Sequence, residues 1–129
     1  MGVRRRVSSG GPWEARYGYS RAVVDGDSCW VSGTTDAGPD GRSRHPDDPG
    51  GQAREAFDIA GRALAAAGFT LEDVVRTRMF VTDMARATPV LEVHGELFGE
   101  VRPASTIVEV AALIEPSLMV EIELEARRG

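Results

Sequence analysis

The sequence has 129 residues, a formal net charge of −5 and an isoelectric point near 5.0. A chain of this length supports one hydrophobic core, so residues 1–129 are expected to form a single domain. All fifteen basic residues are arginines, and the acidic balance argues against a nucleic-acid binder, which needs a concentrated basic surface. The basic run of Arg4, Arg5 and Arg6 is interpreted as a solvated start to a first strand.

Cysteine and histidine usage restricts the possible chemistry. Cys29 is the single cysteine, so an intrachain disulfide and a zinc ribbon are excluded and a reducing compartment is expected. The two histidines, His45 and His94, lie far apart without a metal-ligand spacing such as HExxH, and we predict neither a metal site nor a cofactor. Because no apolar run resembles a signal sequence or a membrane span, we expect a cytoplasmic protein that does not bind membranes.

The first half of the chain predicts a hairpin followed by a helix. Residues 21–34 contain two apolar runs on either side of Asp25-Gly26, a pair that suits a tight turn. Residues 36–51 are rich in Gly, Pro, Asp and Ser, as is typical of a surface loop. From Gln52 onward apolar residues recur at helical spacing, and Gly68 stands where a C-terminal cap belongs.

The second half predicts a strand over residues 74–82, a helix from Pro89 to Phe98, and two strands over residues 105–113 and 118–126 joined as a hairpin. Hairpin, helix, strand, helix and hairpin together indicate an α+β domain. We therefore expect a mixed β-sheet with two helices packed on one face.

The last predicted strand alternates strictly, with apolar residues at the even positions from 120 to 126 and Met119 and three glutamates at the odd ones. The apolar side is expected to meet the helices. We expect Ser105 and Glu109 to share the acidic side, which nothing in the chain would cover, so other subunits are expected to cover it. From spacing alone, Glu121 is either an interface carboxylate or a functional one.

Several segments resemble the RidA family, also called YjgF or endoribonuclease L-PSP proteins. They are "VSGTT", "QAREAFDIAGRALAAAGF", "VVRTRMFVTDM" and "RPASTIVEVAALIEPSLMVEIELEA", and the match runs from about Gly18 to the end. The resemblance implies a chorismate-mutase-like fold assembled as a homotrimer with a central β-barrel, in which small-molecule ligands bind in clefts between subunits. The best-known members hydrolyse reactive enamines and imines to a 2-oxo acid and ammonia.

The resemblance also implies site residues. The "VEIE" motif makes Glu121 the catalytic carboxylate that positions water for attack on the imine carbon, a role that suits a group able to hold and deprotonate water. Tyr19 would close the cleft, and position 107 is often cysteine in the deaminases. The implied substrate contacts are Tyr19, Ser32, Gly33, Ser105, Thr106 and Ile107.

One position departs from the deaminase pattern. The family motif "PARS" carries an arginine that binds the substrate carboxylate, whereas this chain has "PAST", with Ser105 in that place. A hydroxyl group cannot replace the charge of a guanidinium. Arg102 lies three positions earlier and is an alternative source of this charge, although a regular strand places it on the opposite side from Ser105. The chain thus resembles a branch that lacks the substrate-binding arginine, and a standard 2-imino acid is not the expected substrate.

Three candidate functions follow. The first is an enzyme that deaminates or tautomerises a reactive enamine, imine or related metabolite. The second is a non-catalytic trimeric protein that binds a metabolite or acts like a chaperone. An endoribonuclease is the third, and it ranks last because an acidic cleft repels phosphates. His94 is either a partly buried structural residue or a proton carrier at the cleft edge.

Overall fold

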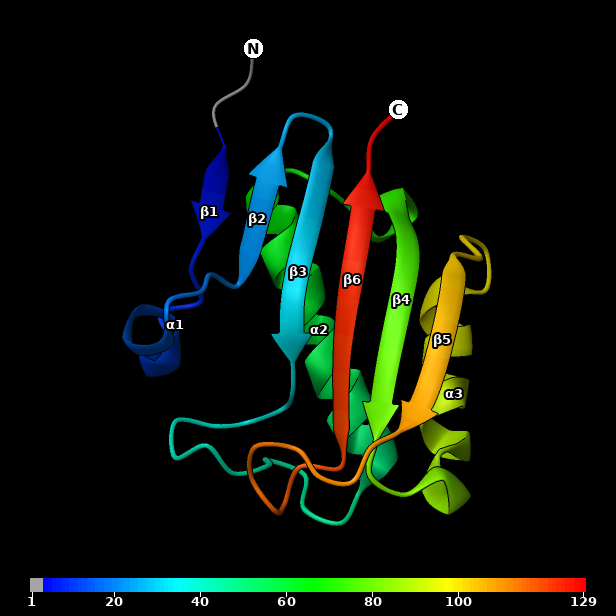
Figure 1. The fold of residues 1–129 in the computed structure, drawn as a ribbon. Helices are drawn as coiled ribbons and strands as arrows, with labels where there is room; N and C mark the ends of the chain where they lie inside the picture. Colours follow the sequence, from blue (N-terminus) through cyan, green and yellow to red (C-terminus); the bar gives the residue numbers. More distant parts are fainter. Residues whose placement is uncertain (1–3) are drawn as a thin grey trace.

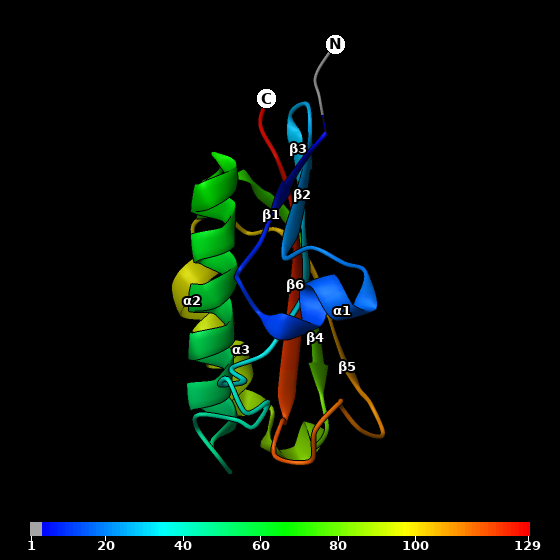
Figure 2. The same cartoon turned by 90° about the vertical axis from the view of Figure 1, so that its left-hand side faces the viewer.

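A six-stranded sheet in the order β1-β2-β3-β6-β4-β5 forms the centre of the molecule (Figure 1). The computed structural model describes residues 4–129. In chain order the elements are β1 (Arg5–Val7), α1 (Pro12–Tyr17), β2 (Ala22–Asp25), β3 (Ser28–Thr34), α2 (Pro49–Ala67), β4 (Val74–Val81), α3 (Thr88–Phe98), β5 (Ala104–Glu109) and β6 (Val120–Arg127), with short helical turns at Leu71–Asp73 and Met84–Arg86. The two long helices, α2 and α3, cover one face of the sheet (Figure 2), which confirms the predicted α+β architecture.

The predicted first hairpin and first long helix are confirmed, although the helix begins earlier than expected. β2 and β3 pair around Gly26, whose φ of 60° suits the tight turn. α2 starts at Pro49 rather than Gln52, because the Asp48 side chain accepts a hydrogen bond from the Gly51 amide and proline is tolerated in the first turn. Gly68 ends α2 with a φ of 89°.

The short helix α1 was not predicted from the sequence. Pro12 opens the helix directly after Gly11, and Gly18 ends it in the left-handed conformation with a φ of 79°. β1 precedes it and pairs with β2 at the edge of the sheet. In Figure 2, α1 lies on the side of the sheet opposite α2. In Figure 1, α1 lies beyond the β1–β2 edge of the sheet, so it does not cover the face that α2 and α3 leave uncovered, which is called the open face below.

The prediction that the last two strands form a hairpin is wrong. β5 pairs in parallel with β4, while β6 runs antiparallel between β3 and β4. Val120, Ile122 and Leu124 are at most 1% exposed, as suits a strand with neighbours on both sides and helices over one face. β5 is largely exposed along its length and suits the sheet edge.

The prediction that β6 presents its apolar side to the helices is confirmed. Its buried residues belong to the same core cluster as α2. Alanines 53, 56 and 60 of α2 are fully buried, and such small side chains let the helix approach the sheet closely. Burial of one large aliphatic side chain contributes about 1.5–3 kcal/mol, so this layer supplies much of the stability of the fold.

Ser105 does not share a face with the glutamates of β6, contrary to the prediction. In the β4–β5 register Ser105 lies beside Thr77, which is fully buried on the helix side of the sheet. Thr106 lies beside Arg78, whose other neighbour is Glu123 on the open face. The expectation failed because alternation shows only which residues of one strand share a side. Which sheet face that side occupies depends on the register of pairing with the neighbouring strand.

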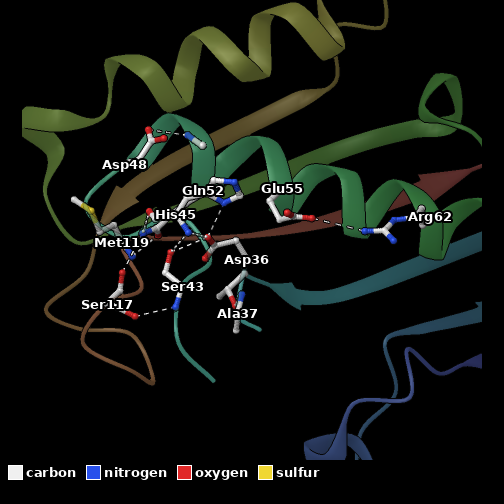
Figure 3. A network of polar contacts seen from close by, with 12 residues as sticks. Asp36, Ala37, Ser43, His45, Asp48, Gln52, Glu55, Arg62, Ser117 and Met119 are labelled. Carbon is white, nitrogen blue, oxygen red and sulfur yellow. Dashed lines mark hydrogen bonds and ion pairs between the residues drawn. The ribbon is translucent and has the colours of Figure 1, made fainter. Parts of the chain in front are cut away.

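A buried polar network fixes the loop that follows β3 (Figure 3). Asp36 is fully buried and accepts a hydrogen bond from the His45 amide at 3.0 Å. Gln52 of α2, also fully buried, donates through Nε2 to the carbonyls of His45 and Ser117 at 3.1 and 3.0 Å. Its Oε1 accepts from the Met119 amide at 2.7 Å. The network ties this loop and the segment before β6 to the first turns of α2.

Candidate functional site

A cavity of about 730 Å³ lies beside α1. Its walls come from the β1–α1 segment, the end of β3, the loop after β3 and the middle of α2. Three of the residues predicted from the sequence line it, namely Tyr19, Gly33 and Glu121. A smaller hollow of about 360 Å³ on the other side of Glu121 is lined by Gly33, Phe80 and Glu123, among others. Glu121 thus borders both hollows.

Glu121 packs directly against the backbone of Gly33. A Cβ atom added at position 33 would lie 2.5 Å from Glu121 Oε2 and 3.0 Å from its Cδ, so a larger side chain at this position displaces the carboxylate. The pairing of β3 with β6 is irregular between Val31 and Thr34, where the chain carries this glycine. Glycine in a strand often marks such an irregularity or a close approach, and here it does both.

Arg21 holds the end of β3 in place. Its Nη1 donates to the Gly33 carbonyl and to Thr34 Oγ1, each at 2.8 Å. The guanidinium carbon lies 5.7 Å from the centre of the Tyr19 ring, within the range of a cation–π contact. Arg21 therefore connects the strand that supports Glu121 with the aromatic residue of the cavity wall.

Glu14 of α1 is the counter-ion of Arg21. Its Oε2 lies 3.9 Å from Arg21 Nε, and the two side chains are only 7% and 11% exposed. Glu14 also accepts hydrogen bonds from the amide and the hydroxyl of Ser9. The Glu14–Arg21–Glu121 group, as these three residues are called below, thus brings two carboxylates and one guanidinium to a single cavity.

The two carboxylates of this group differ in proton affinity. Burial raises the pKa of Glu121 above its ordinary value of 4.5, the charge of Arg21 opposes this shift, and Glu123 adds to it. Burial also acts to raise the pKa of Glu14, but hydrogen bonds from Ser9 and Ser8 and the charge of Arg21 outweigh it, and the pKa of Glu14 is lowered. Glu14 is therefore a stably ionised partner for Arg21, and Glu121 is the better proton acceptor.

The other glutamates of β6 are paired within the chain. Arg78 of β4 lies 3.3 Å from Glu123 and 2.7 Å from Glu125. The neighbouring carboxylates on the open face thus have a counter-ion, which distinguishes them from Glu121.

Four predicted substrate contacts lie outside the lining of the larger cavity. The Ser32 hydroxyl donates to the Ser20 carbonyl at 2.6 Å. Ile107 packs against the core on the helix side of the sheet. Thr106 is exposed on the open face of β5, and Ser105 is exposed on the opposite side of that strand. Within one chain, these residues do not surround Glu121.

Ser105 ends a row of hydrogen bonds that begins at His94. Thr77 Oγ1 donates to Ser105 Oγ at 2.8 Å and is also bonded to His94 Nε2 at 2.8 Å. His94 packs against the rings of Phe57 and Phe98, and burial lowers its pKa. The histidine thus lies on the helix side of the sheet with one nitrogen satisfied, away from the lining of the Glu121 cavity.

Sequence analysis missed Glu14 and Arg21. A signal for Arg21 was present, because it follows Tyr19 by two residues and an extended segment places both on one side. A signal for Glu14 was the segment "GPWE", in which proline and an acidic residue are typical of a first helical turn. The contact between the two side chains depends on the tertiary fold, and no local pattern contains it.

Other kinds of site find little support in the described part of the chain. Within residues 4–129, no three His, Cys, Asp or Glu side chains gather in a way that could hold a metal ion. No helix in that range is long and apolar enough to cross a membrane. Cys29 is buried and unpaired, and burial raises the pKa of its thiol although Arg5 and Arg128 oppose the shift. A thiol that holds its proton is a poor nucleophile.

The fold and the cavity define a class of small α+β proteins, in which two helices cover one sheet face and a carboxylate on the other face borders a cavity. Residues 12–128 match the family model described as Endoribonuclease L-PSP. The chain belongs to this family, which confirms the resemblance to RidA and YjgF proteins.

Named relatives agree with this assignment. The chain is 40% identical over 125 residues to the uncharacterized protein SCO2049 of Streptomyces coelicolor, which covers 97% of this chain and 92% of the relative. It is similar to the crystal structure of Rv2704 from Mycobacterium tuberculosis, described as a member of the YjgF/YER057c/UK114 family, with 48% identity, a TM-score of 0.89, and coverage of 98% and 100%. Escherichia coli TdcF with bound serine is also similar, at 28% identity and a TM-score of 0.78, with coverage of 97% and 94%.

Proposed function

We propose that this protein is a RidA-like enzyme that hydrolytically deaminates or tautomerises a small reactive enamine or imine, or a related metabolite. The observation that carries the proposal is the setting of Glu121. Its carboxylate is half-buried, has a raised pKa, and is held against the Gly33 backbone beside a cavity. A general base works best when its pKa is close to the operating pH.

In the proposed hydrolysis, Glu121 takes a proton from water as the water oxygen attacks the imine carbon. The proton taken up by Glu121 passes to the nitrogen and gives a carbinolamine. The carbinolamine collapses when Glu121 accepts its hydroxyl proton and the nitrogen receives a proton and leaves as ammonia, and a carbonyl compound remains. In the tautomerisation, the same carboxylate removes the enamine N–H proton and a proton is returned to carbon. Both reactions balance without an oxidant, a reductant or a cofactor.

We propose that the site is completed between the subunits of a homotrimer with a central β-barrel. Glu121 faces the open side of a central strand, whereas Ser105 faces the helix side of the edge strand β5. The two therefore contact one ligand only when the β5 edge of a neighbouring subunit approaches this chain's open face. In this assembly Tyr19, Ser32, Gly33, Ser105, Thr106 and Ile107 are the proposed substrate contacts.

The proposed substrate is not a standard 2-imino acid. Ser105 stands where the family's deaminases carry the carboxylate-binding arginine, and its hydroxyl already accepts a hydrogen bond from Thr77. An uncharged hydroxyl lacks the roughly 1.5–3 kcal/mol that a charge-assisted hydrogen bond contributes. A substrate without a carboxylate at that end avoids this loss.

A non-catalytic trimeric protein that binds a metabolite, or acts like a chaperone, is the second candidate. The similar structure of E. coli TdcF holds bound serine, which is a small ligand. An endoribonuclease activity remains the third candidate, although the family description carries that word. The open face around Glu121 also presents Glu123 and Glu125, and acidic groups repel a phosphate backbone.

The test measures ammonia release from freshly generated imines with and without a carboxylate. Glu121→Gln is expected to lower the rate by about 10²–10⁴-fold, because it removes the general base. Glu125→Gln is the matched control, since this carboxylate lies on the same side of β6 and is bonded to Arg78. Sedimentation checks that each variant keeps the trimer.

Ser105→Arg tests the substrate argument in the same assay. It is expected to raise the rate on 2-iminopropanoate by about tenfold to a hundredfold, or roughly 1.4–2.8 kcal/mol, because the guanidinium can bind the carboxylate. The gain should disappear when Glu121→Gln is added. Full activity of the wild type on 2-iminopropanoate would contradict the substrate argument, and an active Glu121→Gln trimer would show that Glu121 is not the general base. A wild type that releases no ammonia from any of these imines would favour the binding-protein candidate.

A further inference from the structure

The charges that line the cavity are paired unequally. Arg21 faces Glu14 at 3.9 Å. Arg62 of α2 lies 3.1 Å from Asp58 and 3.8 Å from Glu55. Within residues 4–129, no cationic nitrogen lies within 4.0 Å of the Glu121 carboxylate, which is the half-buried charge of the wall that lacks a close counter-ion. Arg44 also borders the cavity but is exposed at its rim, where solvent screens its charge.

Arg21 is engaged within the chain through its Nη1 and through the charge of Glu14, although its Nε has no hydrogen-bond partner among residues 4–129. Its Nη1 is occupied by the Gly33 carbonyl and Thr34 Oγ1, and its charge is balanced by Glu14. Glu14 is itself anchored by Ser9 and is 7% exposed, so it cannot readily move aside. An anion that enters the cavity would meet a neutralised guanidinium and the carboxylate of Glu121, and like charges repel strongly where burial limits screening.

The cavity wall suits a cation for a second reason. Trp13 lines it, and aromatic faces attract ammonium-type groups. A ligand cation near Glu121 would also supply the counter-ion that this carboxylate lacks.

We propose that Glu14 is the residue that sets the charge specificity of this cavity. By neutralising Arg21, it leaves Glu121 to select the ligand, and the cavity binds a small cationic nitrogen compound, an amine or iminium without a carboxylate. The inference rests on the proposed function for the role of Glu121 and extends it by naming the charge class of the ligand. It assigns Glu14 to specificity and leaves proton transfer to Glu121.

The experiment compares two probes of similar shape and opposite charge, pyrrolidinium and cyclopentanecarboxylate, titrated into the full-length protein at pH 7 and followed by calorimetry or NMR. The wild type should bind pyrrolidinium at least about tenfold more tightly, which corresponds to about 1.4 kcal/mol. Glu14→Gln frees the charge of Arg21 and should reduce this preference by about tenfold or reverse it. Arg21→Gln leaves Glu14 unneutralised and should increase it.

Glu96→Gln is the matched control, because it breaks an Arg–Glu pair, with Arg54, that is more than half exposed and does not border the cavity. It should leave the preference unchanged. A wild type that prefers the carboxylate, or a folded Glu14→Gln protein with the wild-type preference, would overturn the proposal. If Glu14→Gln does not fold, Arg21→Gln decides, and an unchanged or weaker cation preference in that variant overturns it.

The binding data are independent of the chemistry. If the probes behave as expected but no imine releases ammonia, the proposed reaction fails and the charge specificity stands. If ammonia release depends on Glu121 but the probes bind without the expected preference, the enzyme proposal stands and the assignment of Glu14 fails.

Discussion

The polar network around Gln52 and the Glu14–Arg21–Glu121 group are both withdrawn from solvent, but they satisfy their polar atoms differently. Gln52 makes three hydrogen bonds, all to backbone groups. Asp36 Oδ1 is the exception in that network, since it has no partner among the described residues, although Oδ2 accepts several bonds. In the charged group, Arg21 Nε has no hydrogen-bond partner in the same part of the chain, and Glu121 faces open space.

This difference indicates a structural role for the network around Gln52 and a chemical role for the Glu14–Arg21–Glu121 group. A neutral side chain bonded to three backbone groups fixes the loop after β3 and the segment before β6 in one arrangement. A carboxylate with a raised pKa at a cavity retains the capacity to bind a ligand or a proton, and such groups are enriched at functional sites. We therefore expect changes in the network to alter stability, and changes in the charged group to alter ligand chemistry.

Gln52→Ala is the largest expected effect on stability. It leaves the carbonyls of His45 and Ser117 and the amide of Met119 without their partner, and buried unpaired groups cost about 1–3 kcal/mol each before relaxation and entry of water. We expect a loss of about 2–4 kcal/mol in the free energy of unfolding, measured by urea denaturation.

The control is Arg54→Ala on the same helix, whose exposed ion pair with Glu96 should contribute less than about 1 kcal/mol. Ligand binding by Gln52→Ala, measured below its unfolding temperature, should be close to that of the wild type. A large loss of ligand binding in a folded Gln52→Ala protein would contradict the purely structural role of the Gln52 network.

Gly33→Ala should have the reverse effect. The added Cβ would lie 2.5 Å from Glu121 Oε2, so the flexible carboxylate moves away, while the backbone needs no positive φ at this position. We expect the rate of ammonia release to fall by about tenfold to a hundredfold, because a small displacement of a catalytic group lowers the reaction rate strongly. Stability should change by less than about 1 kcal/mol.

Gly95→Ala in α3 provides the comparison for this variant, since nothing lies within 4 Å of the added Cβ. It should stabilise the protein by up to about 1 kcal/mol and leave the rate unchanged. If Gly33→Ala unfolds the protein instead, the glycine is a structural requirement of the sheet, and its role in placing Glu121 is contradicted.

The pH dependence of stability is the smallest expected effect, and it has opposite signs for the two carboxylates. The raised pKa of Glu121 means that its contribution to stability is complete below its unfolded pKa and is lost as pH rises through its folded pKa. The lowered pKa of Glu14 means that its contribution is present at neutral pH and is lost as pH falls through its folded pKa.

Thermal unfolding between pH 3 and pH 8 measures both signs. At pH 7, Glu121→Gln should be more stable than the wild type and Glu14→Gln less stable, and both differences should shrink in acid. Equal effects of the two substitutions at pH 7 would show that the cavity does not distinguish its two carboxylates.

Local patterns in the sequence determined several elements correctly. The alternation of residues 118–126 identified the buried and acidic sides of β6, because side chains alternate across any strand. Asp25-Gly26 located the β2–β3 turn, and Gly68 located the end of α2, because these residues tolerate the conformations required there. Glu121, Tyr19 and Gly33 were found through family resemblance, and the cavity brings them together.

Tertiary structure alone decided which strands are neighbours and which side chains meet. The insertion of β6 between β3 and β4 suits the burial of its apolar row. The side occupied by Ser105 follows from its register with Thr77, and a shift by one residue would reverse it. The contact between Glu14 and Arg21 requires α1 to lie beside the segment that precedes β2. Alternation and turn signals are local properties of the chain, whereas pairing, register and docking depend on residues that are distant in the sequence.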